Sequence, residues 1–156
     1  MTLRLLFAGL ILASLTAGPA VANQDLDNFY LGGGVANNTV GNESAVGYQF
    51  IGGYDFGTVL GNANLMAEVG YWNSGTFGDG PGRASAKGLW STAVASLPLT
   101  GYWSLLGRAG LDFGDDDGLI VGIGAAYRAA PQLDLRGEIV ARDNVDSFQF
   151  NVLYRF

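Results

Sequence analysis

The chain has 156 residues, of which 14 are acidic and 8 are basic, and it contains neither His nor Cys. A net charge of −6 argues against nucleic acid as a partner, because phosphates require a basic surface. The missing Cys excludes disulfides and thiol nucleophiles, and the missing His removes the commonest general base and metal ligand. We therefore expect no cofactor, no metal site and no catalytic residues.

The first 22 residues have the pattern of a secretory signal peptide. A short positive start is followed by an apolar run and by the small-x-small sequence Ala20-Val21-Ala22. The apolar run is shorter than the roughly 20 residues of a spanning helix, which disfavours the alternative of a retained anchor. We predict cleavage after Ala22, with Ala20 and Ala22 as the cleavage-site residues, and one exported domain at 23–156.

After the signal peptide, turn-forming clusters divide the chain into eight segments in which apolar and polar residues alternate. This alternation is typical of β-strands, in which successive side chains point to opposite faces. The predicted strands are 29–37, 45–56, 63–73, 84–97, 102–113, 119–128, 133–142 and 147–156. Because the number of strands is even, the first strand starts and the last strand ends on the same side of the sheet.

The last segment shows which environment the strands prefer. Its apolar face consists of Phe148, Phe150, Val152, Tyr154 and Phe156. A soluble sandwich would turn such a face inward, whereas a membrane barrel turns it to lipid and keeps charges in its lumen. The charges of the other segments recur opposite the apolar face, and aromatic residues cluster near segment ends, as at a membrane interface. We predict an all-β, eight-stranded antiparallel up-and-down transmembrane β-barrel in the outer membrane of a Gram-negative cell.

Charged and polar residues are expected on the lumen face of most strands. They are Gln49, Asp55, Glu68, Arg108, Asp112, Arg128, Asp134, Arg136, Glu138, Arg142 and Arg155. The fourth strand allows two registers, which differ in the residues that face the lumen. If Val94 faces the lumen, Trp90 also points inward and Lys87 points outward, and the opposite register reverses all three. We prefer the register with Val94 inward.

Several short motifs occur in an order that resembles a known family. They are Glu68-Val69-Gly70-Tyr71, Leu97-Pro98-Leu99-Thr100, Gly107-Arg108-Ala109-Gly110, Tyr127 to Pro131, Arg136-Gly137-Glu138 and Tyr154-Arg155-Phe156. With the export signal, they resemble the small eight-stranded OmpA/OmpX-type outer-membrane barrels, most closely the OmpA-like membrane domain. Longer relatives append a peptidoglycan-binding domain, which we do not expect here because the chain ends at its last predicted strand.

The resemblance implies a lumen network of two glutamates, a lysine and an arginine that bridge facing strands. Glu68 and Arg136 match the third-strand acid and the seventh-strand base, whereas Val94 and Ala126 stand where the family has the lysine and the second glutamate. One charge of each sign is lost, so the lumen stays balanced. The predicted lumen charge network is Glu68, Arg108, Arg136, Glu138 and Arg155.

Two further motifs suggest chemistry that we do not favour. Glu68 and Glu138 could pair as a general acid and base, but inward carboxylates beside arginines are more often structural ion pairs. The run Asp115-Asp116-Asp117-Gly118 lacks the alternating ligands and terminal Glu of a calcium loop, so we interpret it as a solvated acidic turn.

These observations predict a structural protein of the outer membrane with no catalytic activity. The alternative is a small low-conductance pore, because inward glycines would leave room in the lumen, and a lipid-acting enzyme is less favoured. Expected partners are outer-membrane lipid, lipopolysaccharide and, during biogenesis, the barrel assembly machinery. The resemblance makes Phe148, Phe150, Val152, Tyr154 and Phe156 the signal that this machinery reads. The oligomeric state stays open.

Overall fold

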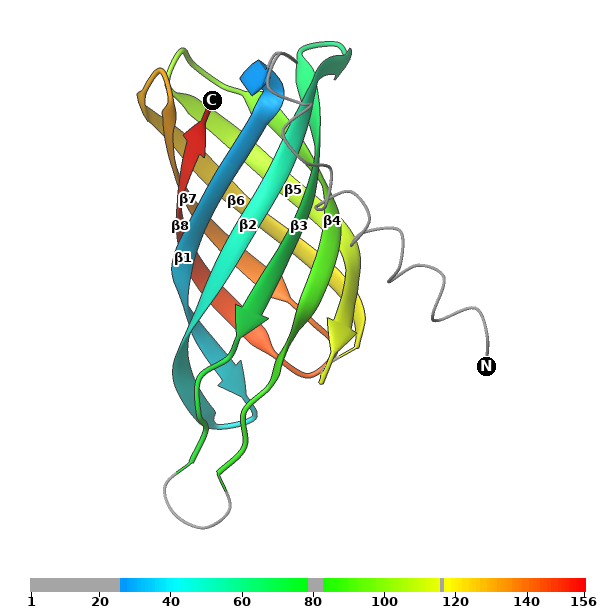
Figure 1. Ribbon diagram of the computed structural model, residues 1–156, viewed down its shortest axis with the longest axis vertical. Coiled ribbons are helices and arrows are strands. Elements are labelled where there is room, and N and C mark those ends of the chain that lie inside the picture. The colour runs from blue at the N-terminus through cyan, green and yellow to red at the C-terminus, as the bar shows by residue number, and fades with distance from the viewer. Residues whose placement is uncertain (1–25, 79–82, 116) are drawn as a thin grey trace, which may run out of the picture.

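The structure, a computed structural model of the chain, describes residues 26–78, 83–115 and 117–156. Within them, the 3-10 turn η2 (Leu26–Asn28) precedes eight strands. The strands are β1 (Phe29–Val40), β2 (Glu43–Leu60), β3 (Ala63–Asn73), β4 (Lys87–Pro98), β5 (Trp103–Gly114), β6 (Gly118–Ala130), β7 (Leu133–Ala141) and β8 (Asp146–Arg155). Each strand pairs antiparallel with the next, and β8 pairs with β1, which closes the barrel (Figure 1). The predicted fold class is confirmed.

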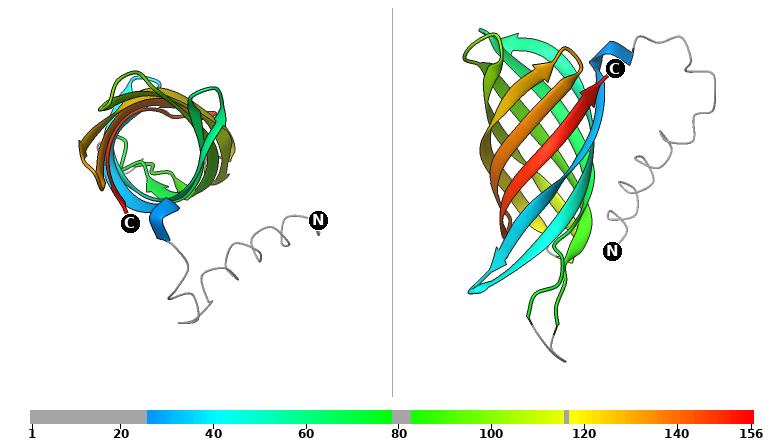
Figure 2. Two further views of the ribbon diagram at one scale, coloured as in Figure 1. Left: turned by 90° about the horizontal axis from the view of Figure 1, so that it is seen from above. Right: turned by 90° about the vertical axis from the view of Figure 1, so that its left-hand side faces the viewer.

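The two ends of the barrel differ. The start of β1 and the end of β8 lie beside the short turns β2–β3, β4–β5 and β6–β7, at what we call the terminal end (Figure 2). The β3–β4 connection extends from the opposite end, called the loop end. The predicted signal peptide and its cleavage residues, Ala20 and Ala22, lie outside the described residues. In the described part of the chain, no helix has the length and apolar character needed to span a bilayer.

Side chains of β8 alternate between the lumen and the outer surface. The predicted outward residues from Phe148 to Tyr154 are 40–61% exposed, while the lumen-facing residues between them are at most 1% exposed. A continuous apolar outer surface of this kind is unfavourable in water and suits the hydrocarbon of a membrane. The barrel therefore has its polar side inside and its apolar side outside.

Strand β2 is longer than its alternation pattern predicted. It continues past the predicted end at residue 56 to Leu60, and its register with β3 shifts between Asp55 and Thr58 and again before Leu60. Gly57 lies between these shifts with a φ of 76°, a conformation that favours glycine. Such irregularities break the period-two pattern, so the predicted strand ended where the bulged region begins.

Strand β4 has the predicted register, but it begins at Lys87, later along the chain than predicted. Val94 and Trp90 are buried in the lumen, and Lys87 is exposed, as the preferred register predicted. The predicted start at residue 84 is wrong, because Ala84 forms an isolated bridge with Phe77 in the β3–β4 connection. Regular pairing with β3 and β5 begins only at Lys87 and Gly88.

The lumen is filled by side chains and serves as the core of the protein. Its largest fully buried apolar residues are Tyr30, Met66, Trp90, Ile120 and Leu153. An eight-stranded barrel is just wide enough for its interior to be filled in this way.

Inward glycines make room for these side chains. A Cβ atom at Gly53 would collide with the ring of Tyr30, and one at Gly124 would collide with the side chain of Glu138. The expectation that these glycines leave space in the lumen is wrong at both positions, because a large neighbour occupies the space.

Candidate functional site

Four charged side chains meet in the middle of the lumen and form the central cluster: Glu68 on β3, Arg108 on β5, and Arg136 and Glu138 on β7. Arg108 donates from Nη2 to Glu68 Oε2 at 3.0 Å and from Nε to Glu138 Oε2 at 2.7 Å. Arg136 donates from Nη1 to Glu68 Oε1 at 2.5 Å. All four side chains are at most 2% exposed. The barrel thus brings together four of the five residues predicted for the network.

Aromatic rings enclose the central cluster. The hydroxyl of Tyr30 donates to Glu68 Oε1 at 2.6 Å, and the Arg136 guanidinium lies 5.5 Å from the centre of the Tyr30 ring. Arg108 lies 5.3 Å from the ring centre of Trp90, so both arginines make cation–π contacts. The sequence reasoning did not assign Tyr30 to the site. Its position between two outward residues, with a buried hydroxyl that needs a partner, was the available signal.

Two small side chains lie beside the arginines of the central cluster. Val94 is opposite Arg108 in the pairing of β4 with β5, and Ala126 is opposite Arg136 in the pairing of β6 with β7. These are the positions where the family resemblance places a lysine and a second glutamate. Because one charge of each sign is replaced, the balance is kept, and the central cluster has two acids and two bases, with Arg108 and Glu138 beside Glu68 and Arg136.

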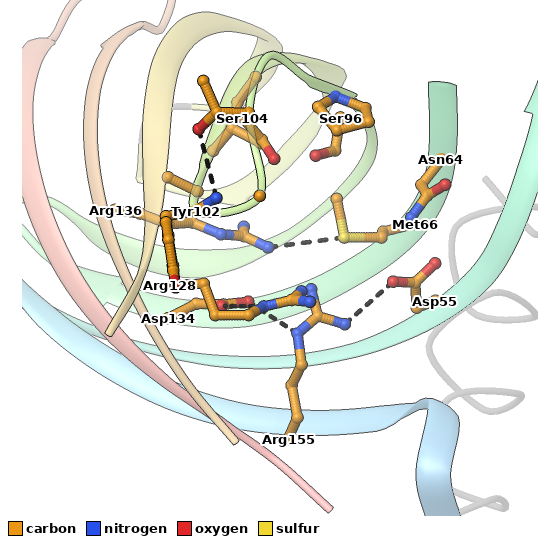
Figure 3. A pocket seen from close by; sticks show the side chains of 15 residues that line it. Asp55, Asn64, Met66, Ser96, Tyr102, Ser104, Arg128, Asp134, Arg136 and Arg155 are labelled. Atoms are coloured by element: carbon orange, nitrogen blue, oxygen red, sulfur yellow. Dashed lines mark hydrogen bonds and ion pairs between the residues drawn. The ribbon is translucent and has the colours of Figure 1, made fainter. Parts of the chain in front are cut away.

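A second group of four charges, the rim cluster, lies at the terminal end and consists of Asp55, Arg128, Asp134 and Arg155 (Figure 3). Arg155 donates to Asp55 at 2.9 Å and to Asp134 at 2.7 Å. Arg128 donates to the other oxygen of Asp134 at 3.2 Å. The Arg128 side chain is 50% exposed and that of Arg155 is 18% exposed, so this cluster is in contact with solvent.

The position of Arg155 corrects the prediction of one common network. Its ion pairs are with Asp55 and Asp134, and the ring of Tyr30, whose centre is 5.3 Å from its guanidinium carbon, lies between it and Glu68 of the central cluster. Strand alternation correctly predicted that Arg155 faces the lumen. Height along the barrel axis depends on strand tilt and stagger, which a single strand's pattern does not contain.

A third group of polar and aromatic side chains lies in the lumen toward the loop end. Arg142 donates to Asp112 at 2.8 Å and stacks over Trp72, whose ring centre lies 4.3 Å away. The indole of Trp72 donates to Asp112 at 3.1 Å. Arg142 also donates to Ser147 at 3.2 Å, and Ser147 donates to Asn38 at 2.6 Å. This group ties β1, β3, β5 and β8 together across the lumen.

The ion pairs of the described residues balance the lumen charge. They join five carboxylates to five arginines, all drawn from the three groups above. Glu68 and Glu138 are fully buried as side chains, and both accept hydrogen bonds from Arg108. This geometry is that of structural ion pairs, because a general acid or base must reach a substrate.

A cavity of about 120 Å³, called the vestibule, lies at the terminal end (Figure 3). The rim cluster lines it together with Ser96, Ser104 and Met66. The guanidinium of Arg136 forms part of its inner wall and contacts the sulfur of Met66 at 3.6 Å. The vestibule is thus a polar recess whose inner wall belongs to the central cluster.

The remaining predicted residues lie away from the lumen. Phe148, Phe150, Val152 and Tyr154 cover the outer surface of β8, and Phe156 follows the strand and donates from its backbone to Phe29 at 3.1 Å. Asp116 of the acidic turn lies outside the described residues. Among the residues that the structure does describe, no group of three or more His, Cys, Asp or Glu side chains is placed to hold a metal ion.

The closed sheet, its apolar outer surface and its charged lumen define an integral membrane β-barrel. Residues 8–156 match the family described as the outer membrane protein beta-barrel domain. The chain belongs to this family and is a protein of the outer membrane.

Three solved structures illustrate the likeness of fold. Ail, the attachment invasion locus protein of Yersinia pestis, is 16% identical with a TM-score of 0.55, over 83% of this chain and 97% of Ail. Neisserial surface protein A is 15% identical with a TM-score of 0.54, over 82% and 97% of the two chains. A designed transmembrane β-barrel is 20% identical with a TM-score of 0.59, over 85% and 98%. No curated protein sequence matches the chain.

Proposed function

We propose that this outer-membrane barrel has a structural role in the cell envelope, with a lumen closed to solutes and no catalytic activity. The observation that carries the proposal is the central cluster, whose four charged side chains are at most 2% exposed and span the lumen from β3 to β7. The rings of Tyr30 and Trp90 are equally buried beside it. Solutes would have to displace these side chains in order to pass.

Opening the lumen would be energetically costly. Before water can enter, Arg108 would have to leave Glu68, Glu138 or both, and their hydrogen bonds would be lost while the charges are still buried. Leaving a buried charge without its partner costs about 3–5 kcal/mol. At that cost the separated pair, through which the lumen would have to open, is populated in fewer than about one molecule in a hundred.

Ion flux from vesicles tests this proposal. The protein is folded into phospholipid vesicles that contain a chloride-sensitive dye, with protein-free vesicles and vesicles carrying a general porin as references. A closed lumen predicts an efflux rate equal to that of the protein-free vesicles. A leak that grows with the amount of folded protein would contradict the proposal.

The vestibule supports a small low-conductance pore as the second candidate. It extends from the terminal end to the Arg136 side chain, so part of the path that a pore would need is already present. Single-channel recording in a planar bilayer distinguishes the two candidates. Steady ion-selective openings of the unmodified protein would favour the pore.

The absence of catalysis is supported by the chemistry of the chain. It has no His and no Cys, and the carboxylates of Glu68 and Glu138 are held by Arg108 without exposed surface. Incubation with labelled lipid A or phospholipid is therefore expected to yield no product. Turnover that disappears in Glu68→Gln or Glu138→Gln would establish a lipid-acting enzyme instead.

The outward residues of β8 are proposed to contact the barrel assembly machinery during biogenesis, and outer-membrane lipid and lipopolysaccharide afterwards. Phe156 is exposed at the end of this strand, where a partner can reach it. We expect Phe156→Ala to reduce the amount of folded protein in the outer membrane of cells, while leaving refolding in detergent unchanged. Equal accumulation of the unmodified protein and the Phe156→Ala variant in cells would contradict the proposed role of Phe156.

A further inference from the structure

The lipid-facing surface has a hollow of about 350 Å³, called the outer groove. It is lined by Trp103 on β5, Ala125 and Tyr127 on β6, Leu135 and Gly137 on β7, and Phe150 on β8. None of these side chains is charged. The groove therefore lies on the face of the barrel that is turned to the hydrocarbon of the outer membrane.

The groove exists because its floor consists of two small residues. Ala125 and Gly137 are paired across β6 and β7, and Gly137 is in turn paired with Phe150 on β8. A Cβ atom added at Gly137 would meet no atom within 4 Å, so the space above it is open. A larger side chain at Gly137 would fill the hollow without disturbing the backbone.

The wall of the groove lies on its terminal side. Trp103, Tyr127 and Leu135 are paired in one row across β5, β6 and β7, and this row is nearer the terminal end than the row that contains the floor. The rings of Trp103 and Tyr127 are 5.0 Å apart. Trp and Tyr near a barrel end are typical of the depth of lipid headgroups. The groove thus leads from headgroup level into the hydrocarbon.

We propose that the outer groove binds one acyl chain of a phospholipid from the leaflet at the terminal end. With its headgroup at the level of Trp103 and Tyr127, the lipid would lay its chain over Ala125 and Gly137 toward Phe150. A flexible chain can follow the hollow and pack against both rows, and van der Waals packing is the attraction available between apolar groups inside a membrane.

The shape of the groove favours a lipid chain over a second copy of the barrel. Trp103 and Phe150 are exposed on opposite sides of the floor. These protruding rings admit a narrow chain, but they hold the broad wall of another barrel away from Ala125 and Gly137. The occupant that fits is therefore slender, apolar and conformable.

Native mass spectrometry of protein extracted from phosphatidylethanolamine bilayers into mild detergent tests the proposal. We expect the unmodified monomer to retain one phospholipid, and Gly137→Leu to lower the lipid-bound fraction about fivefold, because the leucine side chain fills the space in which the acyl chain would pack. Gly107→Leu is the matched control, because a Cβ atom there also meets nothing within 4 Å and the residue does not line the groove. It should retain the lipid as the unmodified protein does.

Several results would overturn the assignment. They are an unmodified protein without bound lipid, equal retention by the Gly137→Leu variant, equal loss in the Gly107→Leu control, and a dimer that the Gly137→Leu substitution dissociates. The last result would show that a second copy occupies the groove.

A second measurement needs no substitution. Trp103 is exposed at the groove, whereas Trp72 and Trp90 are buried in the lumen. The protein is folded in phospholipid with brominated acyl chains and then transferred to an excess of detergent. Retained quenching of the Trp103 emission is expected from a chain that stays in the groove. Complete recovery as fast as mixing would contradict the proposal.

Discussion

The central cluster and the rim cluster have the same composition, two carboxylates and two arginines, in different surroundings. The central side chains are at most 2% exposed, whereas Arg128 and Arg155 of the rim are 50% and 18% exposed. A buried charge depends on its partners, while a charge at the rim can exchange a partner for water. The same set of charges is therefore buried at the centre of the lumen and lines a solvent-accessible recess at its end.

The largest effect is expected when the central cluster loses a base. Arg108→Met should lower the free energy of unfolding by about 3–5 kcal/mol, because Glu138 loses the arginine that bonds both its oxygens and Glu68 loses one of two arginines. Urea titration of the protein folded in vesicles, followed by tryptophan fluorescence, measures the change. A loss below about 1 kcal/mol would show that the central charges depend on each other no more than surface charges do.

A compensating substitution should recover part of this loss. In Arg108→Met combined with Glu138→Gln, a neutral amide replaces the carboxylate that would be left without its arginine, so we expect the double variant to regain about 1–3 kcal/mol relative to Arg108→Met alone. The same urea titration, arranged as a double-mutant cycle, gives the coupling between the two residues. Additive losses would mean that burial of unpaired charge is not the cause.

A smaller effect is expected when the rim loses its best-connected base. Arg155→Met should lower the free energy of unfolding by about 1–2 kcal/mol, because Asp134 keeps Arg128 and Asp55 can be hydrated. Urea titration against the unmodified protein measures this difference. A loss equal to that of Arg108→Met would remove the distinction between the two clusters.

The smallest change in the free energy of unfolding is expected for Arg128, the most exposed arginine of the rim cluster. Arg128→Ala should change the free energy of unfolding by less than about 1 kcal/mol, as is usual for a surface ion pair. The effect of Arg128→Ala should also shrink when salt is added, whereas that of Arg108→Met should persist. Urea titrations at low and high salt compare the two variants.

The sequence predicted the barrel well because alternation reports directly which face each residue occupies. All of the predicted outward residues from Phe148 to Tyr154 are exposed, and Val94 is buried as the preferred register required. Strand ends were less predictable. The bulges near Gly57 and the isolated bridge at Ala84 depend on pairing between strands, which no single segment contains.

The candidate site was predictable in composition and only partly in arrangement. The alternation along each strand identified Glu68, Arg136 and Arg155 as facing the lumen. The height at which each side chain crosses the lumen follows instead from the tilt and stagger of the closed barrel. That geometry separates Arg155 from the central cluster and brings Tyr30 into it. The sequence of one strand shows which of its side chains face the lumen, whereas their height along the barrel axis depends on the whole sheet.

The most direct test of a closed lumen uses the absence of native cysteine. Val94→Cys places one thiol beside Arg108 in the filled centre, and Ser104→Cys places one in the vestibule. Both variants are folded in vesicles and exposed to a charged, water-soluble thiol reagent, and modification is followed by mass. We predict rapid modification at position 104 and almost none at position 94. Comparable rates at the two positions would contradict a closed lumen.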